Sequence, residues 1–468
     1  MKFLQIHSFY PHYLRSFYAA RPGLATQSYE LQFDVLLSDG FTASHLYAPP
    51  LARLGYDARL LIGNCEPLQR AWLAENSSSS FGGHWLYDVT RKQVEAYRPD
   101  VLYISDPITF DSRFVRSLSY RPHVVYGWRA AEFPAWVDMT SFDLILSNEQ
   151  GCMRQAESHG ARATQHFRPG FPEWIASQVS MEPKSYDAVF CGQITPLHTR
   201  RIELLNRLAQ YADKTHAFAP HLFIRSGLEH EALCGGSYTH PALWGLDMHR
   251  AVKRGKVCIN SVIDFAKGEA GNMRQFEVTG TGSFLLTESN PTLAQQFEPG
   301  REVETYQSFE ELVEKISYYL THDNEREAIA RRGQERCLKD HGMTTRSQEL
   351  FGIAQSRLSG SAPRRTVTKI VEDQSPDGSD SSPSALLSRA AQALQADRVA
   401  ESYKLILSAQ TISETCPFLL YLRALCLLKL DRFPDAVEDL TEELKRYPDN
   451  QPAHDLLQQV IAALHAAS

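Results

Sequence analysis

The chain contains no C-x-x-C pair, although it has eight cysteines, at positions 65, 152, 191, 234, 258, 337, 416 and 426. Such scattered cysteines disfavour a structural zinc site and a disulfide framework, and they favour a reduced, cytoplasmic setting. The first residues, MKFLQIHSFYPHY, have an apolar run of only about five residues, too short for a secretory signal. No run approaches the roughly 20 apolar residues of a membrane helix, so no transmembrane segment is expected.

The chain also lacks an excess of positive charge. The formal net charge is −7 and the pI is near 6.2, whereas nucleic-acid-binding proteins present a basic face to phosphates. We therefore expect no nucleic-acid partner. No Asp-x-Asp follows a predicted strand, because the acidic run DGSD lies in a polar linker. We expect neither a metal nor a cofactor.

Short β-branched or aromatic runs recur in the first 150 residues and alternate with segments of helical spacing. The candidate strands are 2–7, 58–63, 100–105, 123–128 and 142–147. This alternation is typical of a parallel sheet, so residues 1–168 are predicted to form a Rossmann-like domain.

The same pattern starts again after the stretch HFRPGFPEW (166–174). The candidate strands are 187–194, 221–227, 256–262 and 282–288, and they predict a second Rossmann-like domain over residues 169–358. Two such domains face a cleft between the carboxyl edges of their sheets, where open α/β folds bind ligands. The predicted fold class is therefore α/β, with the site in that cleft.

The last part of the chain differs in composition. Residues 359–384 are rich in Ser, Pro, Asp and Gly and predict a flexible linker. Beyond it, DRVAESYKLIL (397–407) and DRFPDAVEDLT (431–441) match at a separation of 34 residues, and Ala390 falls on Ala424. This period resembles the tetratricopeptide repeat (TPR). Residues 385–468 are predicted to form a small all-α TPR-like domain with 451–467 as its capping helix; a generic helical hairpin array is the alternative.

The stretch GEAGNMRQFEVTGTGSFLLTE (268–288) places Glu269 and Glu277 eight positions apart. A buried strand should end just before it, at Asn260. Asn272 is predicted to be the N-cap of a helix that runs from Met273 to about residue 279, because glycines follow. This helix would begin in the cleft.

A helix that begins there suits a ligand with phosphates. Its unpaired N–H groups attract a diphosphate, and Gly271 would let that diphosphate come close. Arg274 and Glu277 share a helix face, where arginine can bind phosphate and a carboxylate can accept both hydroxyls of a ribose. The alternative is a local Arg274–Glu277 salt bridge with Glu269 in solvent.

The Glu-x7-Glu spacing inside a second Rossmann-like domain resembles the retaining nucleotide-sugar glycosyltransferases of GT-B fold. Residues 272–346, with Arg-x-Phe-Glu, Phe-x-Pro-Gly and Glu-Arg-x-x-Ile-Ala elements, are similar to the CgeB-like branch, as are EPLQRAWLAEN (66–76) and RPDVLYISD (98–106). The resemblance implies a hexosyltransferase that uses a nucleoside-diphosphate sugar, foremost a UDP-sugar. We expect metal-independent, retaining transfer to a protein or a bacterial cell-surface glycan, with the tail recruiting a protein partner.

The resemblance also implies roles for individual residues. Glu277 is expected to hold the donor ribose and Glu269 the transferring sugar, while Trp244 and Gly245 would meet the nucleotide base, with a packed turn as the alternative. The donor-binding candidates are Gly192, Trp244, Gly245, Met248, Asn260, Gly271, Asn272, Met273, Arg274 and Glu277. Gly192 is expected in a loop near the diphosphate. His198, Arg200 or Arg201 would add positive charge there, although Arg201 in solvent is the alternative.

Acceptor activation has several candidates. His45 and Asp39 join Glu269 as catalytic candidates, and Asp106 also follows a strand; an N-cap or packing role is the alternative for each. The aromatic segment 7–34 is either an acceptor platform or a packed loop. Two other functions stay open: a non-catalytic nucleotide-sugar-binding scaffold and a nucleotide-sugar epimerase of the same fold.

Overall fold

The computed structural model describes residues 1–77, 81–82, 85–134, 137–194, 199–226, 236–262, 272–359, 383–395, 398–412, 416–429 and 432–466. These residues fall into two compact units. The first unit contains two parallel β-sheets, and the second contains helices. Within the described ranges, every helix falls short of the length and apolar character that a membrane span needs.

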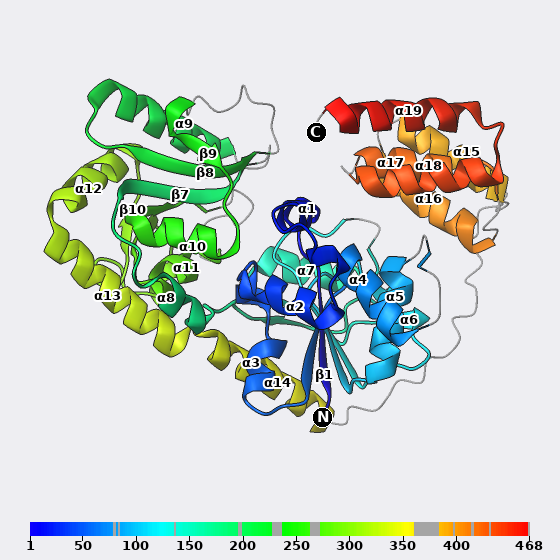
Figure 1. Cartoon of the computed structure of the whole chain (residues 1–468), viewed down its shortest axis with the longest axis horizontal. Helices are drawn as coiled ribbons and strands as arrows, with labels where there is room; N and C mark the ends of the chain where they lie inside the picture. The colour runs from blue at the N-terminus through cyan, green and yellow to red at the C-terminus, as the bar shows by residue number, and fades with distance from the viewer. Residues whose placement is uncertain are drawn as a thin grey trace. The chain divides into compact units, whose positions relative to one another are not determined.

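The first sheet has six parallel strands in the order β2-β1-β3-β4-β5-β6. Strand β1, which is labelled in Figure 1, lies inside this sheet. Its strands are β1 Phe3–His7, β2 Ala58–Ile62, β3 Val101–Ile104, β4 Val124–Trp128, β5 Leu144–Ser147 and β6 Thr164–His166. Every residue of β1 is buried, because helices cover both faces of the sheet. Its helices are α1 Pro11–Ala19, α2 Tyr29–Ser38, α3 Ala48–Arg53, α4 Glu66–Asn76, α5 Trp85–Tyr97, α6 Ser112–Ser117 and α7 Gln150–Ser158, with short 3₁₀ turns η1 Leu24–Thr26 and η2 Ala43–His45.

The second sheet repeats this design in the order β12-β11-β10-β7-β8-β9. Its strands are β7 Tyr186–Ile194, β8 Pro220–Ser226, β9 Thr239–Pro241, β10 Gly255–Asn260, β11 Phe284–Glu288 and β12 Glu304–Tyr306. Its helices are α8 Glu173–Val179, α9 Thr199–Thr215, α10 Gly245–Arg254, α11 Arg274–Gly280, α12 Phe309–Thr321 and α13 Asp323–Asp340, with 3₁₀ turns η4 Gly236–Tyr238 and η6 Leu293–Gln295. One apolar cluster packs on each face of this sheet.

The predicted fold class, two Rossmann-like α/β domains with a helical C-terminal region, is confirmed. Each strand predicted from an apolar run is present in a parallel sheet, and the strand order places β1 and β7 inside their sheets. The short strands β6, β9 and β12 were not predicted. Each has only three residues and lies at a sheet edge, so none has enough residues to show a hydrophobic period.

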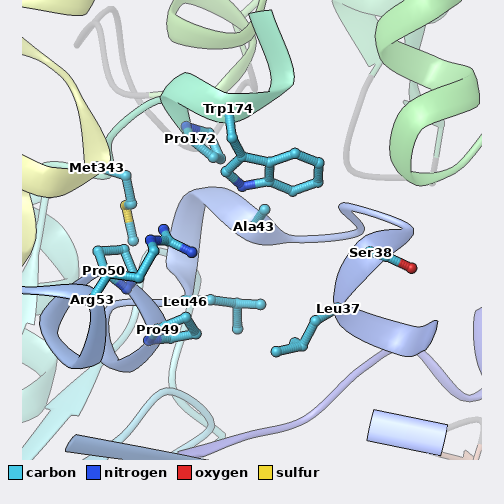
Figure 2. Close-up of a pocket in the computed structure, with 10 residues that line it drawn as sticks. All are labelled: Leu37, Ser38, Ala43, Leu46, Pro49, Pro50, Arg53, Pro172, Trp174 and Met343. Carbon is cyan, nitrogen blue, oxygen red and sulfur yellow. The ribbon is translucent and has the colours of Figure 1, made fainter. Parts of the chain in front are cut away.

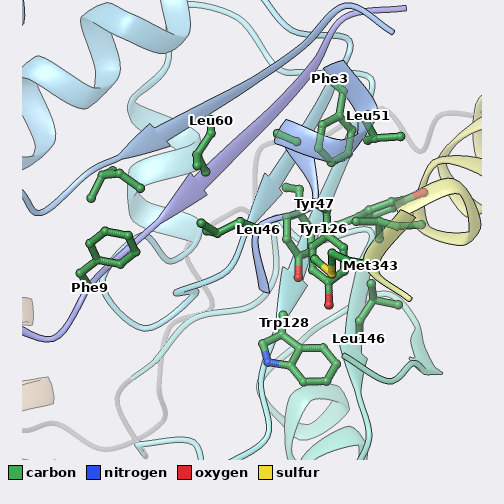
Figure 3. Packing of buried hydrophobic residues seen from close by; sticks show 14 of the residues in the cluster. Phe3, Phe9, Leu46, Tyr47, Leu51, Leu60, Tyr126, Trp128, Leu146 and Met343 are labelled. Atoms are coloured by element: carbon green, nitrogen blue, oxygen red, sulfur yellow. The ribbon is translucent and has the colours of Figure 1, made fainter. Parts of the chain in front are cut away.

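The last helix of the first unit, α14 (Met343–Ser359), packs along α3 and β4 of the first sheet domain, and only its first residues hydrogen-bond to the segment at the start of α8. Met343, Leu350 and Phe351 are buried in the core of the first domain, and Figure 3 shows Met343 close to Tyr126. The sequence-based division placed residues up to 358 in the second domain. The helix crosses back because its apolar residues complete the core beside α3 and β4.

Gly352 provides a test of this helix. It lies inside α14, and a β-carbon there would meet no atom within 4 Å. Gly352→Ala is therefore expected to raise the free energy of unfolding by about 0.5–1 kcal/mol, since alanine loses less backbone entropy in a helix. Thermal unfolding would measure it. The matched control is Gly333→Ala in α13, which should destabilise because its β-carbon would collide with the Glu302 carbonyl oxygen.

The second unit contains five helices within its described residues: α15 Pro383–Gln395, α16 Val399–Ile412, α17 Leu419–Lys429, α18 Phe433–Arg446 and α19 Gln451–Ala466. Helix α15 packs along α16, α17 along α18, and α18 along α19. Ala390 and Ala424, which the 34-residue match aligns, are both fully buried. Small side chains at these positions allow the close helix contacts, and the TPR assignment itself stays a prediction.

Candidate functional site

A cavity of about 310 Å³ lies in the first unit, between the second sheet and the first sheet domain. The first domain contributes Tyr10 and residues 40–42. The second domain contributes the carboxyl ends of β7, β8 and β10 and the first turns of α10 and α11. Open α/β sheets bind ligands at this edge, so the cavity is the candidate site.

The wall of this cavity is positively charged. Among the described residues of the wall, Arg201, Arg225 and Arg274 stand against one carboxylate, Glu277, so these four side chains sum to a charge of +2. His249 also lines the cavity, and burial together with the charge of Arg274 lowers its pKa to about 3, so the ring is neutral at pH 7. Such a wall attracts an anionic ligand.

Arg274 and Glu277 form an ion pair in the wall, with Arg274 Nη1 2.8 Å from Glu277 Oε2. The Glu277 side chain is 7% exposed and that of Arg274 is 20% exposed. Arg274 also donates to Met248 Sδ, which fixes its guanidinium against α10. The local salt bridge that was named as the alternative is therefore present and lies in the cavity wall, and the binding of phosphate and ribose by these residues stays a prediction.

Asn260 and Asn272 are joined by their side chains. Asn272 Nδ2 donates to Asn260 Oδ1 at 2.7 Å, and Asn260 Nδ2 donates to Thr287 Oγ1 at 2.9 Å. The prediction of Asn272 as a helix N-cap was wrong, because α11 begins at Arg274 with Met273 before it and no side-chain cap. Asn272 instead ties the start of this segment to the end of β10.

Trp244 and Gly245 lie at the first turn of α10, where the two sheet domains touch. Gly245 has a φ of 51°, and a β-carbon there would collide with the Asp39 carbonyl oxygen. That oxygen accepts a hydrogen bond from Leu246 N at 2.7 Å. Trp244, Gly245 and Met248 all line the cavity. Glycine is therefore required here by both backbone conformation and close approach.

The catalytic candidates of the first domain do not line the cavity. The carboxylate of Asp39 accepts from Tyr13 Oη at 2.8 Å and from Arg21 at 3.3 Å, while burial raises its pKa. His45 packs against Trp128, and burial lowers its pKa to about 4. Asp106 accepts from Thr109 N. These contacts match the structural alternatives named for them, with Asp39 linking the two sheet domains.

Two further arginines of the wall join segments that are far apart in the chain. Arg201, for which solvation was the alternative, is 8% exposed and donates to the carbonyl oxygens of Gln193 and Ser261, so it ties the end of β7 to the residue after β10. Arg225 in β8 reaches the first domain, where its guanidinium lies 5.4 Å from the centre of the Tyr10 ring. Arg201 was among the residues expected to add positive charge, whereas Arg225 was missed, because nothing in the sequence of a strand shows which of its side chains face a cavity.

Some of the remaining donor-site candidates line the cavity and others do not. Gly192 lines the cavity from within β7, which continues to Ile194, so the expected loop at Gly192 is a strand. Arg200 is 75% exposed beside Glu288 and lies outside the cavity wall. Met273 lines the cavity. His198, Glu269 and Gly271 lie outside the described residues.

The aromatic segment of the first domain is mostly packed. Tyr13 stacks on Phe41 with ring centres 3.8 Å apart, and Phe41 contacts Trp244 at 5.3 Å. Tyr13 and Phe17 are buried, whereas Tyr10 faces the cavity. The packed-loop interpretation therefore describes most of this segment, and its contact with Trp244 helps to join the sheet domains.

A second cavity, of about 290 Å³, lies where the chain passes between the two sheet domains (Figure 2). Its wall includes Leu37, Leu46, Pro172, Trp174 and Met343, and Arg53 is the one charged residue among the described residues that line it. This wall offers a nucleotide few polar partners. Elsewhere in the described part of the chain, no three His, Cys, Asp or Glu side chains lie close enough to hold a metal ion.

Comparison with known proteins adds a family match. Residues 202–352 match a family model described as glycosyl transferase-like. Comparison with curated proteins gave no match. Similar solved structures include Anabaena HepE in complex with UDP and glucose (14% identity, TM-score 0.47, 76% of this chain and 100% of that chain). Others are a Rickettsia africae glycosyltransferase (9%, 0.48, 77% and 100%) and Staphylococcus aureus TarM (10%, 0.42, 57% and 58%).

The matched segment runs from α9 into α14 and contains Arg225, Arg274 and Glu277. It therefore includes three of the four charged residues of the cavity wall. The match covers the greater part of the second sheet domain and shows that this part of the chain is similar to glycosyl transferase-like proteins.

Proposed function

We propose that this glycosyl transferase-like chain moves a sugar from a nucleoside-diphosphate sugar to an acceptor hydroxyl, and that the cavity between its sheet domains binds the donor. The bond between the anomeric carbon and the diphosphate oxygen breaks, and a bond from that carbon to the acceptor oxygen forms. The acceptor's proton leaves with the products, and the diphosphate departs with the extra negative charge.

The observation that carries the proposal is the charge of the wall. A leaving diphosphate gains negative charge as the bond breaks, and preorganised positive groups in a partly desolvated site stabilise that charge. Arg201 and Arg274 are held in place by other protein atoms, so they need not reorganise during the reaction. We propose that these arginines supply the charge without a metal, and that Glu277 accepts hydrogen bonds from the ribose hydroxyls.

The test is direct. Calorimetry would measure binding of UDP, GDP and dTDP, and a coupled assay would measure nucleotide released from their sugar conjugates in the presence of protein and glycan acceptors. Binding of one diphosphate and acceptor-dependent release support the proposal. If no nucleoside diphosphate binds, the proposal is wrong; if the sugar is interconverted with no acceptor, the protein is an epimerase, and binding with no turnover indicates a scaffold.

Arg225 yields a separate prediction. The described residues place no carboxylate within ion-pair distance of it, and it faces the cavity beside Tyr10. Arg225→Gln is expected to weaken binding of the nucleoside diphosphate about two- to tenfold, the effect of losing one hydrogen bond or a screened charge. Calorimetry at two salt concentrations would measure it, since the lost charge also lowers the salt dependence.

The control for this prediction is Arg200→Gln. Arg200 is 75% exposed and lies outside the cavity wall, so its removal should leave the affinity unchanged. Equal losses in both variants would mean that only the overall charge of the protein matters, and that Arg225 makes no contact with the ligand.

Several finer features complete the proposal. We propose that the donor is a UDP-sugar, that the chain belongs to the CgeB-like branch and retains the anomeric configuration, and that Glu269 and Gly271 meet the sugar and the diphosphate. We propose a protein or glycan acceptor, recruitment of a partner by the TPR-like unit, and a cytoplasmic location. Mass spectrometry and NMR of the product would test the donor, acceptor and stereochemistry.

A further inference from the structure

Thr42 stands out on the first-domain wall of the cavity. Its φ is 51° and its ψ is 19°, a left-handed conformation that is unfavourable for a β-branched residue. The conformation is maintained by the surrounding turn, in which Ala43 N donates to Gly40 O and His45 N donates to Thr42 O at 2.8 Å. Residues held in this way often have a ligand-binding role.

Among the described residues, the hydroxyl of Thr42 has one hydrogen-bond partner, His7, at the end of β1. His7 Nε2 lies 3.0 Å from Thr42 Oγ1. The imidazole is buried, with Phe9 packed edge-on against it at 5.4 Å between ring centres. Burial and the neighbouring His45 lower the pKa of His7 to about 3, so at pH 7 the ring has one N–H and one lone pair.

The direction of this hydrogen bond follows from the other ring nitrogen. His7 Nδ1 is buried and has no hydrogen-bond partner among the described residues. Among backbone groups, a buried N–H without a partner is rarer than a buried C=O without one, and by the same reasoning we assign the proton of His7 to Nε2. His7 Nε2–H then donates to Thr42 Oγ1. This leaves the O–H of Thr42 as a donor without a partner in the described part of the chain, on a residue that lines the cavity.

We propose that Thr42, oriented by His7, donates a hydrogen bond to an oxygen of the sugar end of the donor. The inference rests on the proposed function and adds a residue that contacts the transferred group. Arg274, Glu277 and Trp244 lie on the second-domain wall. A donor whose nucleotide is held there presents its sugar to the opposite wall, which Thr42 occupies. His7 is a positioning residue that acts through this hydroxyl.

The substitution that tests Thr42 is Thr42→Val, because valine is also β-branched and therefore keeps the backbone strain while it removes the hydroxyl. We expect the dissociation constant and KM of the sugar conjugate to rise about three- to tenfold, the effect of one lost hydrogen bond. The affinity for the free nucleoside diphosphate should stay within about twofold, since that part of the ligand does not reach Thr42. Thr42→Ser keeps the hydroxyl and should keep most of the affinity.

A double-mutant cycle tests the role of His7. His7→Leu removes the donor to Thr42, and His7→Gln keeps an N–H at a similar position. His7→Leu should raise KM for the sugar conjugate, His7→Gln should restore part of the loss, and the His7→Leu/Thr42→Val double variant should bind no worse than Thr42→Val alone. A purely structural role for His7 predicts additive effects instead. Binding of the free diphosphate reports that each variant is folded.

The probes are UDP, GDP and dTDP and their glucose and N-acetylglucosamine conjugates. If the Thr42→Val variant binds the diphosphate and its sugar conjugate as the wild type does, with equal turnover, this inference is wrong and the proposed function still stands. Equal weakening of both ligands also overturns it, because the hydroxyl would then contact the diphosphate. If the wild type binds no diphosphate, the proposed function fails first and this inference fails with it.

Discussion

Glu277→Gln is expected to weaken binding of the nucleoside diphosphate about ten- to hundredfold, which corresponds to about 1.5–3 kcal/mol. The glutamine keeps the shape of the side chain but removes the charge that accepts the ribose hydroxyls and balances Arg274. Glu277 is nearly buried, so water replaces little of what is lost. Calorimetric titration with UDP, GDP and dTDP measures the effect. Unchanged affinity would mean that the ribose binds elsewhere.

Glu277→Gln would also weaken binding indirectly if the loss of the ion pair with Arg274 destabilised the fold. Comparison with a double variant separates this structural effect from a direct effect on the ligand. Arg274→Met with Glu277→Leu removes both charges and leaves no unpaired one, so the free energy of unfolding should recover relative to Glu277→Gln. If the pair serves ligand binding, the double variant still binds poorly. If the pair is only structural, binding recovers with stability.

A matched control lies in the helical unit. Arg398 and Glu401 repeat the Arg-x-x-Glu spacing on α16, with 2.7 Å between Arg398 Nη1 and Glu401 Oε2, and both side chains are exposed. Glu401→Gln should change neither the affinity nor the stability measurably, because exposed pairs contribute little.

Gly245→Ala is expected to lower the free energy of unfolding of the first unit by about 2–5 kcal/mol, from the left-handed backbone and from overpacking against Asp39. Its β-carbon would meet both the carbonyl oxygen and the carboxylate of Asp39. The collisions are removed only if the two sheet domains move apart, and that movement breaks the hydrogen bond from Leu246 N to Asp39 O. Donor affinity should fall as well, since Trp244 and Gly245 line the cavity.

Gly300→Ala is the control for the backbone effect alone. Gly300 has a φ of 78°, and a β-carbon there would meet no atom within 4 Å, so the expected loss is only about 1–2 kcal/mol with no change in donor binding. Chemical denaturation of both variants gives the comparison. Equal losses would contradict the close approach of Gly245 to Asp39.

The parts of the fold that were predicted correctly are those with a strong local pattern. Each long buried strand, such as β1 or β7, is an apolar run between turn residues, and the alternation with helices indicates a parallel sheet. The assignment of α14 failed because its apolar residues show only that it packs on a core. The local sequence does not show which of the two cores the helix packs on, and Phe351 belongs to the core of the first domain.

The candidate site shows the same limit. Arg274 and Glu277 were found because their spacing places them on one helix face, and both line the cavity. Arg225 and His249 were missed, since each is an ordinary residue of a strand or helix until the fold brings it to the cavity. His45 and Asp39 were named from their place after a long loop, but loop position does not determine side-chain direction, and Asp39 is engaged by Tyr13 and Arg21.

Local chemistry thus specified two parallel-sheet domains, a helical tail and the Arg274–Glu277 pair, because hydrophobic period and helix spacing act over a few residues. Which side chains share one cavity depended on packing between segments far apart in the chain. Asp39 against Gly245, Arg225 against Tyr10 and His7 against Thr42 are contacts of this kind. They arise only after the strands are ordered and the domains have met, and they set the shape and charge of the site.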